Sequence, residues 1–376
     1  MAEEQVLVEI EEKEETKKKK KKSDSDEVKS SLLIKRKKET PIHARELLSS
    51  GCTQLNLQCT GKPAGCYPKG TYIHLVGDSD SGKTWLALTA FGEASINPSF
   101  DGYVFYYFHG ENGALMDKAG CFGKKAAARI EDIPVSSPEE FYYQLDTRHK
   151  KGKPYISVLD SMDSLWPVDD ADRFEENKKL YEEGKDAKGS FGVIKPKTNS
   201  ALLRVAANRL NKNGSILIII SQTRDTIGYN ATFNPKSYSG GHALKFYSQL
   251  QIWVSSKGDI KKTVKGKERQ LGIYSKLHVK KNHITGAKGA VDIPIYHNPG
   301  MMDDIGSCIE YLAEEGKWKE TKGKVTAPEF EFEGSIEKLA QKIDSEGLEK
   351  ELRILVSETW DEIQDACRIQ RKSRYE

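Results

Sequence analysis

Four short apolar runs in the first two thirds of the chain each lead directly into a polar or turn residue. They cover residues 71–76, 102–108, 155–159 and 215–220. Runs that are apolar at almost every position are typical of central parallel strands buried on both faces. Residues 201–210, between the last two runs, have apolar side chains at helical spacing, at Leu202, Leu203, Ala206 and Leu210. This alternation of strands and helices predicts an α/β fold with an open, mostly parallel sheet.

Later parts of the chain follow a different pattern. Residues 249–254, 271–279 and 290–296 are predicted strands with few helices between them, which indicates an antiparallel extension of the sheet. After Pro299 the pattern is mostly helical, at residues 305–315 and 336–372. We therefore expect a core domain at residues 41–300 and a small C-terminal α+β domain at residues 301–376.

The first 40 residues differ from the rest in composition. They hold 12 Lys and Arg, 11 Asp and Glu and no aromatic residue, with six lysines in a row at residues 17–22. Such a segment buries too little apolar surface to offset its ordering entropy, so residues 1–40 are predicted to be a disordered charged tail. The lysine run is consistent with a nucleic-acid tether, a targeting signal or a solubilising tail, and the sequence leaves these open.

Overall charge and cysteine content exclude several classes of protein. The 376 residues include 59 Lys and Arg and 56 Asp and Glu, a net charge of +3. No apolar run is long enough to span a bilayer, and the N-terminus has no signal-peptide pattern. Cys52, Cys59 and Cys66 lie too far apart for a typical zinc site or disulfide framework, so we expect free thiols in a loop region. These features predict a soluble cytoplasmic protein with no membrane partner.

The first apolar run leads into a glycine-rich motif. Residues 77–84 fit G-x-x-x-x-G-K-[ST], with a strand before them and a helical stretch after them. Glycines in such a loop let backbone N–H groups surround phosphates, and the helix N-terminus adds its dipole. We therefore predict a site for ATP and Mg²⁺, with Lys83 at the β- and γ-phosphates and Thr84 on the metal. The loop consists of Gly77, Asp78, Ser79, Asp80, Ser81, Gly82, Lys83 and Thr84.

Acidic residues occur in this loop and after two of the strands. The carboxylates of Asp78 and Asp80 are unusual beside an anion, but the backbone does the binding and these side chains can point away. Asp160 ends the third apolar run, where a carboxylate can hold a water of the Mg²⁺ shell. Glu111 follows the second run, at the carboxyl edge where sites of open sheets gather, and is a candidate for orienting the attacking water. A solvated loop acid would explain the position of Glu111 equally well.

The order of these motifs resembles that of the bacterial RecA recombinase family. The resemblance covers roughly residues 45–320 and rests on the P-loop, on Glu111 and on four later stretches. These are VLDSMDSL at 158–165, ISQTRDTIG at 220–228, SGGHALKFY at 239–247 and VKKNHI at 279–284. The GG-x-ALKFY element is the most specific of them. Divergence elsewhere indicates a remote member of the family, such as a phage-encoded one, with a RecA-like P-loop ATPase core.

The resemblance implies roles for further residues. Glu111 matches the catalytic glutamate, Asp160 matches the second acidic position, and Gln222 matches the glutamine that senses the γ-phosphate. Gln222 leads into the second DNA-binding loop, residues 223–240, whose cations and aromatic rings suit single-stranded DNA. Its candidate DNA-binding residues are Arg224, Tyr229, Phe233, Lys236, Tyr238, Gly240 and Gly241. Residues 167–199 take the place of the first DNA-binding loop but are unusually long and charged, and the sequence does not show what they contact.

The resemblance also implies a homo-oligomer. In the family, two lysines of the neighbouring subunit in a filament complete the ATP site, and the matching positions here are Lys281 and His283, with Lys280 as an alternative cation. An imidazole is mostly neutral at pH 7. Losing a cation weakens stabilisation of the developing charge, so we predict slower hydrolysis than two lysines would give. Phe246 matches a position at the subunit interface, although core packing would explain it as well.

The C-terminal region of the family gathers duplex DNA. Here basic side chains occur at Lys317, Lys319, Lys322, Lys324, Arg368, Arg371, Lys372 and Arg374. They can attract double-stranded DNA electrostatically, and solvated helix faces would explain them equally well.

These observations lead to one main expectation and two alternatives. We expect a DNA-dependent ATPase that coats single-stranded DNA as a filament and promotes homologous pairing and strand exchange in recombination and repair, in a bacterial or phage-infected cell. One alternative is a RecA-like hexameric helicase or accessory ATPase. The other is a DNA-binding regulator that binds ATP without turnover.

Overall fold

The chain divides into two compact units. The computed structural model describes residues 43–110, 116–183, 194–225, 236–238, 240–298, 300–369 and 371. The core unit extends from Ile42 to Ser307, and the second unit has its described residues from Cys308 onward. The predicted tail lies outside the described residues, as do the candidate site residues Glu111, Tyr229 and Phe233.

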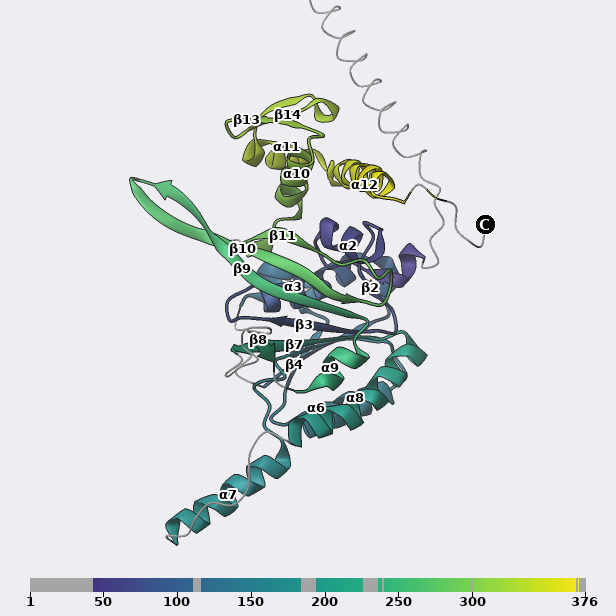
Figure 1. The fold of residues 1–376 in the computed structure, drawn as a ribbon, viewed down its shortest axis with the longest axis vertical. Helices are drawn as coiled ribbons and strands as arrows, with labels where there is room; N and C mark the ends of the chain where they lie inside the picture. Colours follow the sequence, from purple (N-terminus) through teal and green to yellow (C-terminus); the bar gives the residue numbers. More distant parts are fainter. Residues whose placement is uncertain are drawn as a thin grey trace, which may run out of the picture. The chain divides into compact units, whose positions relative to one another are not determined.

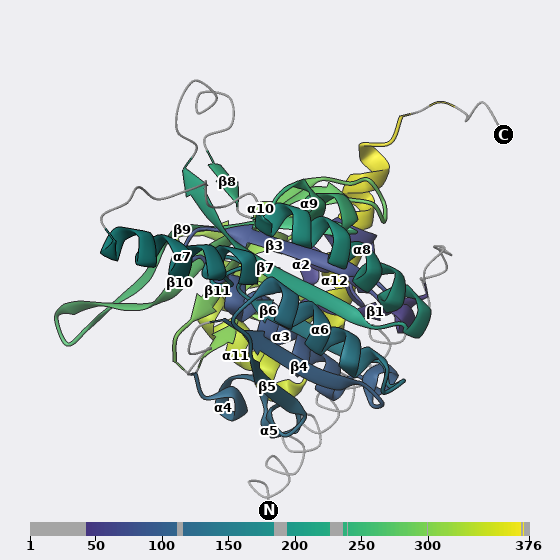
Figure 2. The ribbon, with the colours of Figure 1, turned by 90° about the horizontal axis from the view of Figure 1, so that it is seen from below.

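A ten-stranded sheet runs through the core unit (Figures 1 and 2). Its order is β12-β11-β10-β9-β3-β7-β6-β4-β5, and β8 pairs with an extension of β7. The six strands from β9 to β5 are parallel, and β10, β11 and β12 continue the sheet antiparallel. The prediction of a mostly parallel sheet with an antiparallel extension is thus confirmed. The strands are β3 (Tyr72–Gly77), β4 (Val104–His109), β5 (Ile130–Pro134), β6 (Tyr155–Asp160), β7 (Ile216–Asp225), β8 (Lys236–Tyr238), β9 (Leu250–Val264), β10 (Lys267–Asn282), β11 (Gly289–Tyr296) and β12 (Met301–Met302).

Helices cover both faces of this sheet, which explains why the central strands are apolar at successive positions. Helix α3 (Lys83–Ile96) packs on one face, and α6 (Pro138–His149), α8 (Ile194–Asn213) and α9 (His242–Tyr247) lie on the other (Figure 1). Successive side chains of a strand point to opposite faces. On β4, Phe105 and Tyr107 accordingly join the core on the α3 side, whereas Tyr106 and Phe108 join the core on the α6 side.

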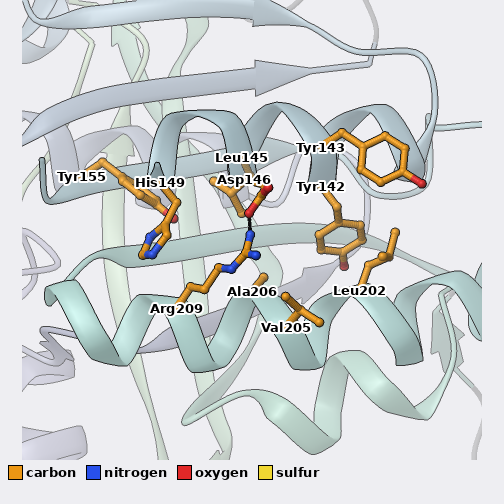
Figure 3. A pocket seen from close by; sticks show the side chains of 10 residues that line it. All are labelled: Tyr142, Tyr143, Leu145, Asp146, His149, Tyr155, Leu202, Val205, Ala206 and Arg209. Atoms are coloured by element: carbon orange, nitrogen blue, oxygen red, sulfur yellow. Dashed lines mark ion pairs between the residues drawn. The ribbon is translucent and has the colours of Figure 1, made fainter. Parts of the chain in front are cut away.

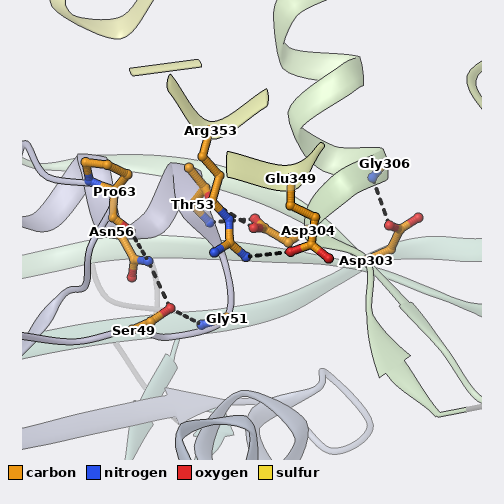
Figure 4. A network of polar contacts seen from close by, with 10 residues as sticks. All are labelled: Ser49, Gly51, Thr53, Asn56, Pro63, Asp303, Asp304, Gly306, Glu349 and Arg353. Atoms are coloured by element: carbon orange, nitrogen blue, oxygen red, sulfur yellow. Dashed lines mark hydrogen bonds and ion pairs between the residues drawn. The ribbon is translucent and has the colours of Figure 1, made fainter. Parts of the chain in front are cut away.

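A small module at the start of the core unit is fixed to the later part of the same unit. Helix α2 (Thr53–Thr60) has no side-chain cap from its own N-cap residue, Cys52. Instead, Asp304 accepts hydrogen bonds from the Thr53 backbone N–H (2.6 Å) and the Thr53 hydroxyl (2.7 Å), as Figure 4 shows. A carboxylate at a helix N-terminus satisfies exposed N–H groups and complements the helix dipole. Short elements surround this module and α3: η1 (Ala44–Glu46), β1 (Leu47–Leu48) paired with β2 (Tyr67–Pro68), η2 (Pro98–Phe100), α4 (Lys118–Phe122) and α5 (Lys124–Ala127).

The expected location of the cysteines was correct for two of the three, but their burial was not predicted. Cys52, Cys59 and Cys66 are free thiols, as predicted, and Cys52 and Cys66 lie in the segments that flank α2, but Cys59 belongs to the helix itself and all three are buried in the core. Burial is the main cause that raises the pKa of the Cys66 thiol well above its ordinary value. Such thiols act as small apolar side chains.

Two segments extend away from the sheet (Figure 1). Within residues 167–199, which were expected to be a loop, the structure has helix α7 (Val168–Glu182) and the first turns of α8. Helix α8 therefore begins at Ile194 rather than near Ala201. The second segment is the outer half of the β9–β10 hairpin, where every residue from Ser255 to Gln270 except Ile260 is exposed.

The second unit combines a three-stranded antiparallel sheet with helices. Its sheet has the order β13-β14-β15, and Trp318 is buried with its indole N–H donated to Glu329 (2.8 Å). The single helical stretch expected at residues 336–372 is two helices, because Gly347 adopts φ +65° and ends the first. The elements are α10 (Asp304–Glu314, which begins in the core unit), β13 (Lys319–Thr321), β14 (Lys324–Ala327), η4 (Pro328–Phe330), β15 (Phe332–Ser335), α11 (Ile336–Glu346) and α12 (Glu349–Ala366). Among the helices of the described residues, none has the length and apolar character needed to cross a membrane.

Candidate nucleotide site and DNA-binding segment

The P-loop joins β3 to α3 and fits tightly against the neighbouring strands. A Cβ atom on Gly77 would lie 2.0 Å from the carbonyl oxygen of Val254 on β9. Gly82 has φ +93°, and a Cβ there would lie 2.5 Å from Cδ1 of Ile295. Ser275 on β10 donates its hydroxyl to the Ser81 carbonyl oxygen (2.7 Å). Close approach therefore requires glycine at both positions, and at Gly82 the backbone conformation requires it as well.

Lys83 is held in the loop with its ammonium group near the loop backbone. Only 7% of the residue is exposed, and Nζ contacts the Asp78 carbonyl oxygen and, at 3.4 Å, Oγ of Ser81. Burial lowers the pKa of Lys83, an effect opposed by the surrounding carboxylates, beginning with Asp160. A largely desolvated ammonium group interacts more strongly with an anion than an exposed one.

Thr84 and Asp160 lie together at the carboxyl edge of the sheet. The Thr84 hydroxyl donates to Oδ2 of Asp160 (2.7 Å), and the Tyr107 hydroxyl lies 3.4 Å from the same oxygen. Burial raises the pKa of Asp160, while the hydrogen bond from Thr84 acts in the opposite direction. Asp160 on β6 is the register partner of His109, the last residue of the neighbouring strand β4. Residue 111 therefore comes two positions after the end of β4. Glu111 itself lies outside the described residues, and its role stays a prediction.

A cavity of about 430 Å³ opens beside these residues. Six consecutive residues of the P-loop and α3 line it, from Asp80 to Trp85. The rest of its lining was not predicted from the sequence: Gln270 and Ile273 on β10, and His297 after β11. These three residues lie far from the motif in the sequence, which gave no signal that they reach the cavity.

The residues present fit ATP and Mg²⁺. Gly82 begins α3 without a side-chain cap, so the first N–H groups of the helix face the cavity as a site for phosphate. Lys83 supplies a cation, and Thr84 and Asp160 supply the oxygen atoms that Mg²⁺ prefers. The apolar and aromatic side chains of Ile273 and Trp85 offer a surface for a nucleoside.

The candidate γ-phosphate sensor lies directly beside the P-loop. Gln222 pairs with Gly77 in the parallel register of β7 and β3. Its backbone N–H donates to Oδ2 of Asp163 (2.7 Å), and Arg224 lies 3.8 Å from the other oxygen of the same carboxylate. Asp163 belongs to the stretch used for the family resemblance, but its part in holding β7 was not predicted.

Residues 223–225 at the end of β7 pair with β8, residues 236–238, and these two short strands form the stem of the predicted DNA-binding segment. The register pairs are Thr223 with Tyr238, Arg224 with Ser237 and Asp225 with Lys236. Lys236 pairs with the Asp78 carboxylate of the P-loop, and the Thr223 hydroxyl donates to the same carboxylate. The stem is therefore joined directly to the nucleotide site.

Other candidate DNA-binding residues have structural contacts in this stem. The Tyr238 ring packs edge-on against His74 at 4.9 Å, and its hydroxyl accepts a hydrogen bond from Gln251 (3.2 Å). Gly240 and Gly241 both have positive φ and precede α9, where added Cβ atoms would collide with Leu244 and Pro196. These three residues shape the stem in this conformation, and contacts with DNA remain a prediction for them.

The two candidate trans residues lie away from the chain's own P-loop, and the His283 N–H donates to the Gln249 carbonyl oxygen (2.9 Å), beside the first residue of β3. Lys281 on β10 is the register partner of Gln251 on β9. Gln251 is in turn the partner of His74 on β3, which lies three residues before Gly77. The Lys281 ammonium donates to the last carbonyls of α9, at Lys245 (2.6 Å) and Phe246 (2.8 Å). Lys280, the alternative cation, lies over the Trp253 ring at 3.6 Å. Phe246 is 72% exposed, which excludes core packing as its explanation.

A smaller cavity of about 190 Å³ lies between α6 and α8 (Figure 3). Tyr143, Val205 and the ion pair between Asp146 and Arg209 are in its wall. None of the predicted site residues lines it, so it is separate from the candidate nucleotide site.

Comparison with known proteins agrees with this geometry. The family described as RecA N-terminal domain matches residues 21–302. The chain belongs to the RecA family. Two curated relatives are the RecA proteins of Streptococcus uberis and Streptococcus pyogenes, each 26% identical over 281 residues that cover 73% of this chain and 68% of the relative. The remote RecA resemblance inferred from the motifs is thus confirmed. RecA-family proteins are DNA-dependent ATPases that bind ATP with Mg²⁺.

Proposed function

We propose that this chain is an ATP-dependent DNA recombinase. It binds single-stranded DNA as a homo-oligomeric filament and promotes homologous pairing with double-stranded DNA and strand exchange. The observation that carries the proposal is the continuity of β7. This strand places Gln222 beside the P-loop and then forms the stem of a segment that carries Arg224 and Lys236. One strand thus connects a phosphate site with a cationic surface suited to a nucleic-acid backbone.

Hydrolysis uses groups at the carboxyl edge of the sheet. ATP supplies the bond that is cleaved, and Mg²⁺ neutralises charge on its phosphates. Lys83 binds the β- and γ-phosphates. Thr84 and Asp160 would hold Mg²⁺, and Asp160 positions the Thr84 hydroxyl. Glu111 orients the attacking water, and Gln222 contacts the γ-phosphate.

Assembly completes the site in this proposal. Lys281 is level with His74 in the first half of β3, and the His283 N–H donates to Gln249, which bonds to Tyr72 at the start of that strand, whereas the P-loop follows its last residue. In this proposal both residues therefore serve the nucleotide of an adjacent copy rather than their own. The exposed Phe246 ring beside Lys281 is available to the same contact. The exposed lysines of the second unit, Lys319, Lys322 and Lys324, attract the duplex.

ATP turnover tests the enzymatic part of the proposal. We expect hydrolysis that single-stranded DNA stimulates and that Lys83→Ala reduces about 100-fold or more, because a phosphate-binding cation is lost. Lys150→Ala is a matched control, since Lys150 is largely exposed and pairs only with Asp146 on α6 among the described residues. Absence of turnover in the wild-type protein would favour the DNA-binding regulator.

Strand exchange distinguishes the recombinase from related ATPases. The full chain should transfer a strand from a labelled duplex to a homologous single-stranded circle when ATP is present. Closed rings on DNA in electron micrographs, together with unwinding and without exchange, would instead indicate a helicase or an accessory ATPase.

A further inference from the structure

The two basic side chains of the stem, Arg224 and Lys236, each form an ion pair with a carboxylate of the same chain. Both described basic side chains of the predicted DNA-binding segment contact carboxylates beside the nucleotide site: Arg224 with Asp163, and Lys236 with Asp78. A DNA phosphate that binds either cation therefore has to compete with a carboxylate of the same chain.

Asp78 is the more informative of the two carboxylates. It directly follows Gly77 in the P-loop, and its two oxygen atoms are divided between the Thr223 hydroxyl and the Lys236 ammonium. These partners come from the two strands of the stem, one from each side of residues 226–235. The pairing with Lys236 is also the first cause that lowers the pKa of Asp78, followed by the bond from Thr223.

The ion pair is accessible to a competing anion. The side chain of Lys236 is 41% exposed and that of Asp78 is 44% exposed. Exposed ion pairs contribute little net free energy, so a polyanion can displace one partner. The backbone carbonyl of Asp78 meanwhile contacts the Lys83 ammonium, so the same residue touches a cation of the nucleotide site and a cation of the stem.

We propose that Asp78 is an internal competitor of single-stranded DNA for Lys236. In the free protein the P-loop carboxylate holds the Lys236 ammonium, and a DNA phosphate takes its place when the strand binds at the stem. Because such competition is reciprocal, DNA binding also releases the Asp78 carboxylate at the nucleotide site. This inference rests on the proposed function, since it requires single-stranded DNA to bind near the β7–β8 stem.

A double-mutant cycle on the full chain tests the competition. Asp78→Asn removes the charge but keeps an oxygen acceptor for Thr223, and it leaves the backbone carbonyl that contacts Lys83. Affinity for a fluorescent oligothymidylate is measured by anisotropy, without nucleotide, over a range of salt concentrations. Asp78→Asn should tighten binding roughly two- to five-fold at low salt, because Lys236 no longer has to leave an ion pair.

The variants at Lys236 identify the group through which Asp78 acts. Lys236→Gln should weaken binding and make the slope of log affinity against log salt shallower by about 0.7, the value for one phosphate contact on a single strand. In the Lys236→Gln background, Asp78→Asn should have no further effect. An equal gain in both backgrounds, or no gain in either, would overturn the proposal.

Asp80→Asn is the matched charge control. Asp80 belongs to the same loop and, among the described residues, makes no ion pair with Lys236. Asn tolerates its φ of +56°. An increase in DNA affinity as large as that of Asp78→Asn would show an effect of net loop charge and would also overturn the proposal. Failure of the wild-type chain to bind the oligonucleotide at all would instead refute the proposed function.

Discussion

Thr84 donates its hydroxyl to Asp160 across 2.7 Å, which joins the first turn of α3 to the end of β6. The bond holds two oxygen-bearing side chains together that are 76 residues apart in the chain. Strands β3 and β6 are separated only by β7 and run parallel, so the P-loop after β3 and the end of β6 lie at the same edge of the sheet. The Asp160 carboxylate is partly buried, and its loss of solvation raises its pKa, which makes its charge costly until a cation binds nearby.

Asp160→Asn tests whether this pair serves Mg²⁺. The amide keeps an acceptor for the Thr84 hydroxyl but removes the negative charge. Nucleotide affinity in the presence of Mg²⁺ should fall about 10- to 100-fold, the usual effect of losing an outer-shell ligand. Calorimetric titration with and without EDTA provides the check. An equal loss of affinity in EDTA would show that Asp160 acts on the fold of the loop rather than through the metal.

Gly77→Ala should destabilise the core more than an ordinary glycine substitution. The new Cβ would lie 2.0 Å from the Val254 carbonyl oxygen, which belongs to the backbone and cannot rotate away. We expect a loss of about 1–3 kcal/mol or more in the free energy of unfolding. Gly102→Ala is the control, because a Cβ there meets no atom within 4 Å. Urea unfolding measures the loss of unfolding free energy in each variant. Similar losses in both would contradict a clash between the added Cβ and the Val254 carbonyl oxygen.

The buried ring of His74 should make the free energy of unfolding fall in acid. The ring is fully buried between Ser221 and Gln251, and burial, with a smaller effect of Lys281, lowers the pKa of His74 to about 3. Between pH 3 and about 6.5 the unfolded chain therefore binds a proton that the folded chain does not, so stability falls as the pH falls. At pH 5 this amounts to about 2 kcal/mol relative to pH 7.5.

The histidine contribution can be separated from that of other titrating groups. His74→Gln retains hydrogen-bonding capacity but does not titrate. The difference in unfolding free energy between pH 7.5 and pH 5 should be about 2 kcal/mol smaller in the variant than in the wild type. An unchanged difference would mean that the ring is protonated in the folded protein.

His283→Lys should accelerate ATP hydrolysis if the residue acts on the site of an adjacent copy. A second permanent cation would stabilise the charge that develops on the phosphoryl group, and we expect an increase in kcat of about tenfold, or ~1.4 kcal/mol. His278→Lys adds the same charge five residues earlier, on β10, which ends directly before His283, and should leave kcat near the wild-type value. Equal acceleration by both variants would indicate a general charge effect.

The sequence was sufficient to predict features that are carried by consecutive residues. The P-loop is one run of eight residues between a strand and a helix, and each buried strand is one apolar run, so local pattern and final structure agree. The antiparallel extension was predictable for the same reason, because strands followed one another without a helix long enough for a crossover.

Contacts between distant residues were not predictable in this way. Lys236 and Asp78 are 158 positions apart, and each has an ordinary interpretation in its own segment, one as a DNA contact and the other as a loop acid. The capping of α2 by Asp304 spans 251 positions, and Gln270, Ile273 and His297 reach the nucleotide cavity only through strand pairing. Helix α7 was missed because its residues are mostly charged and exposed, which removes the apolar periodicity on which helix prediction depends.

Lys281 and His283 lie level with the first half of β3, and the P-loop follows its last residue, which gives any chain-to-chain contact a direction. A copy that offers its lysine to one neighbour must receive a lysine from a different one, the arrangement of a head-to-tail array. An open array then always ends in one protomer whose nucleotide lacks its cation, whereas a closed ring has no such protomer. Turnover per protomer should therefore rise with array length and then level off. Short oligomers would be slower because the terminal protomer, which lacks the neighbouring cation, is a larger fraction of the total.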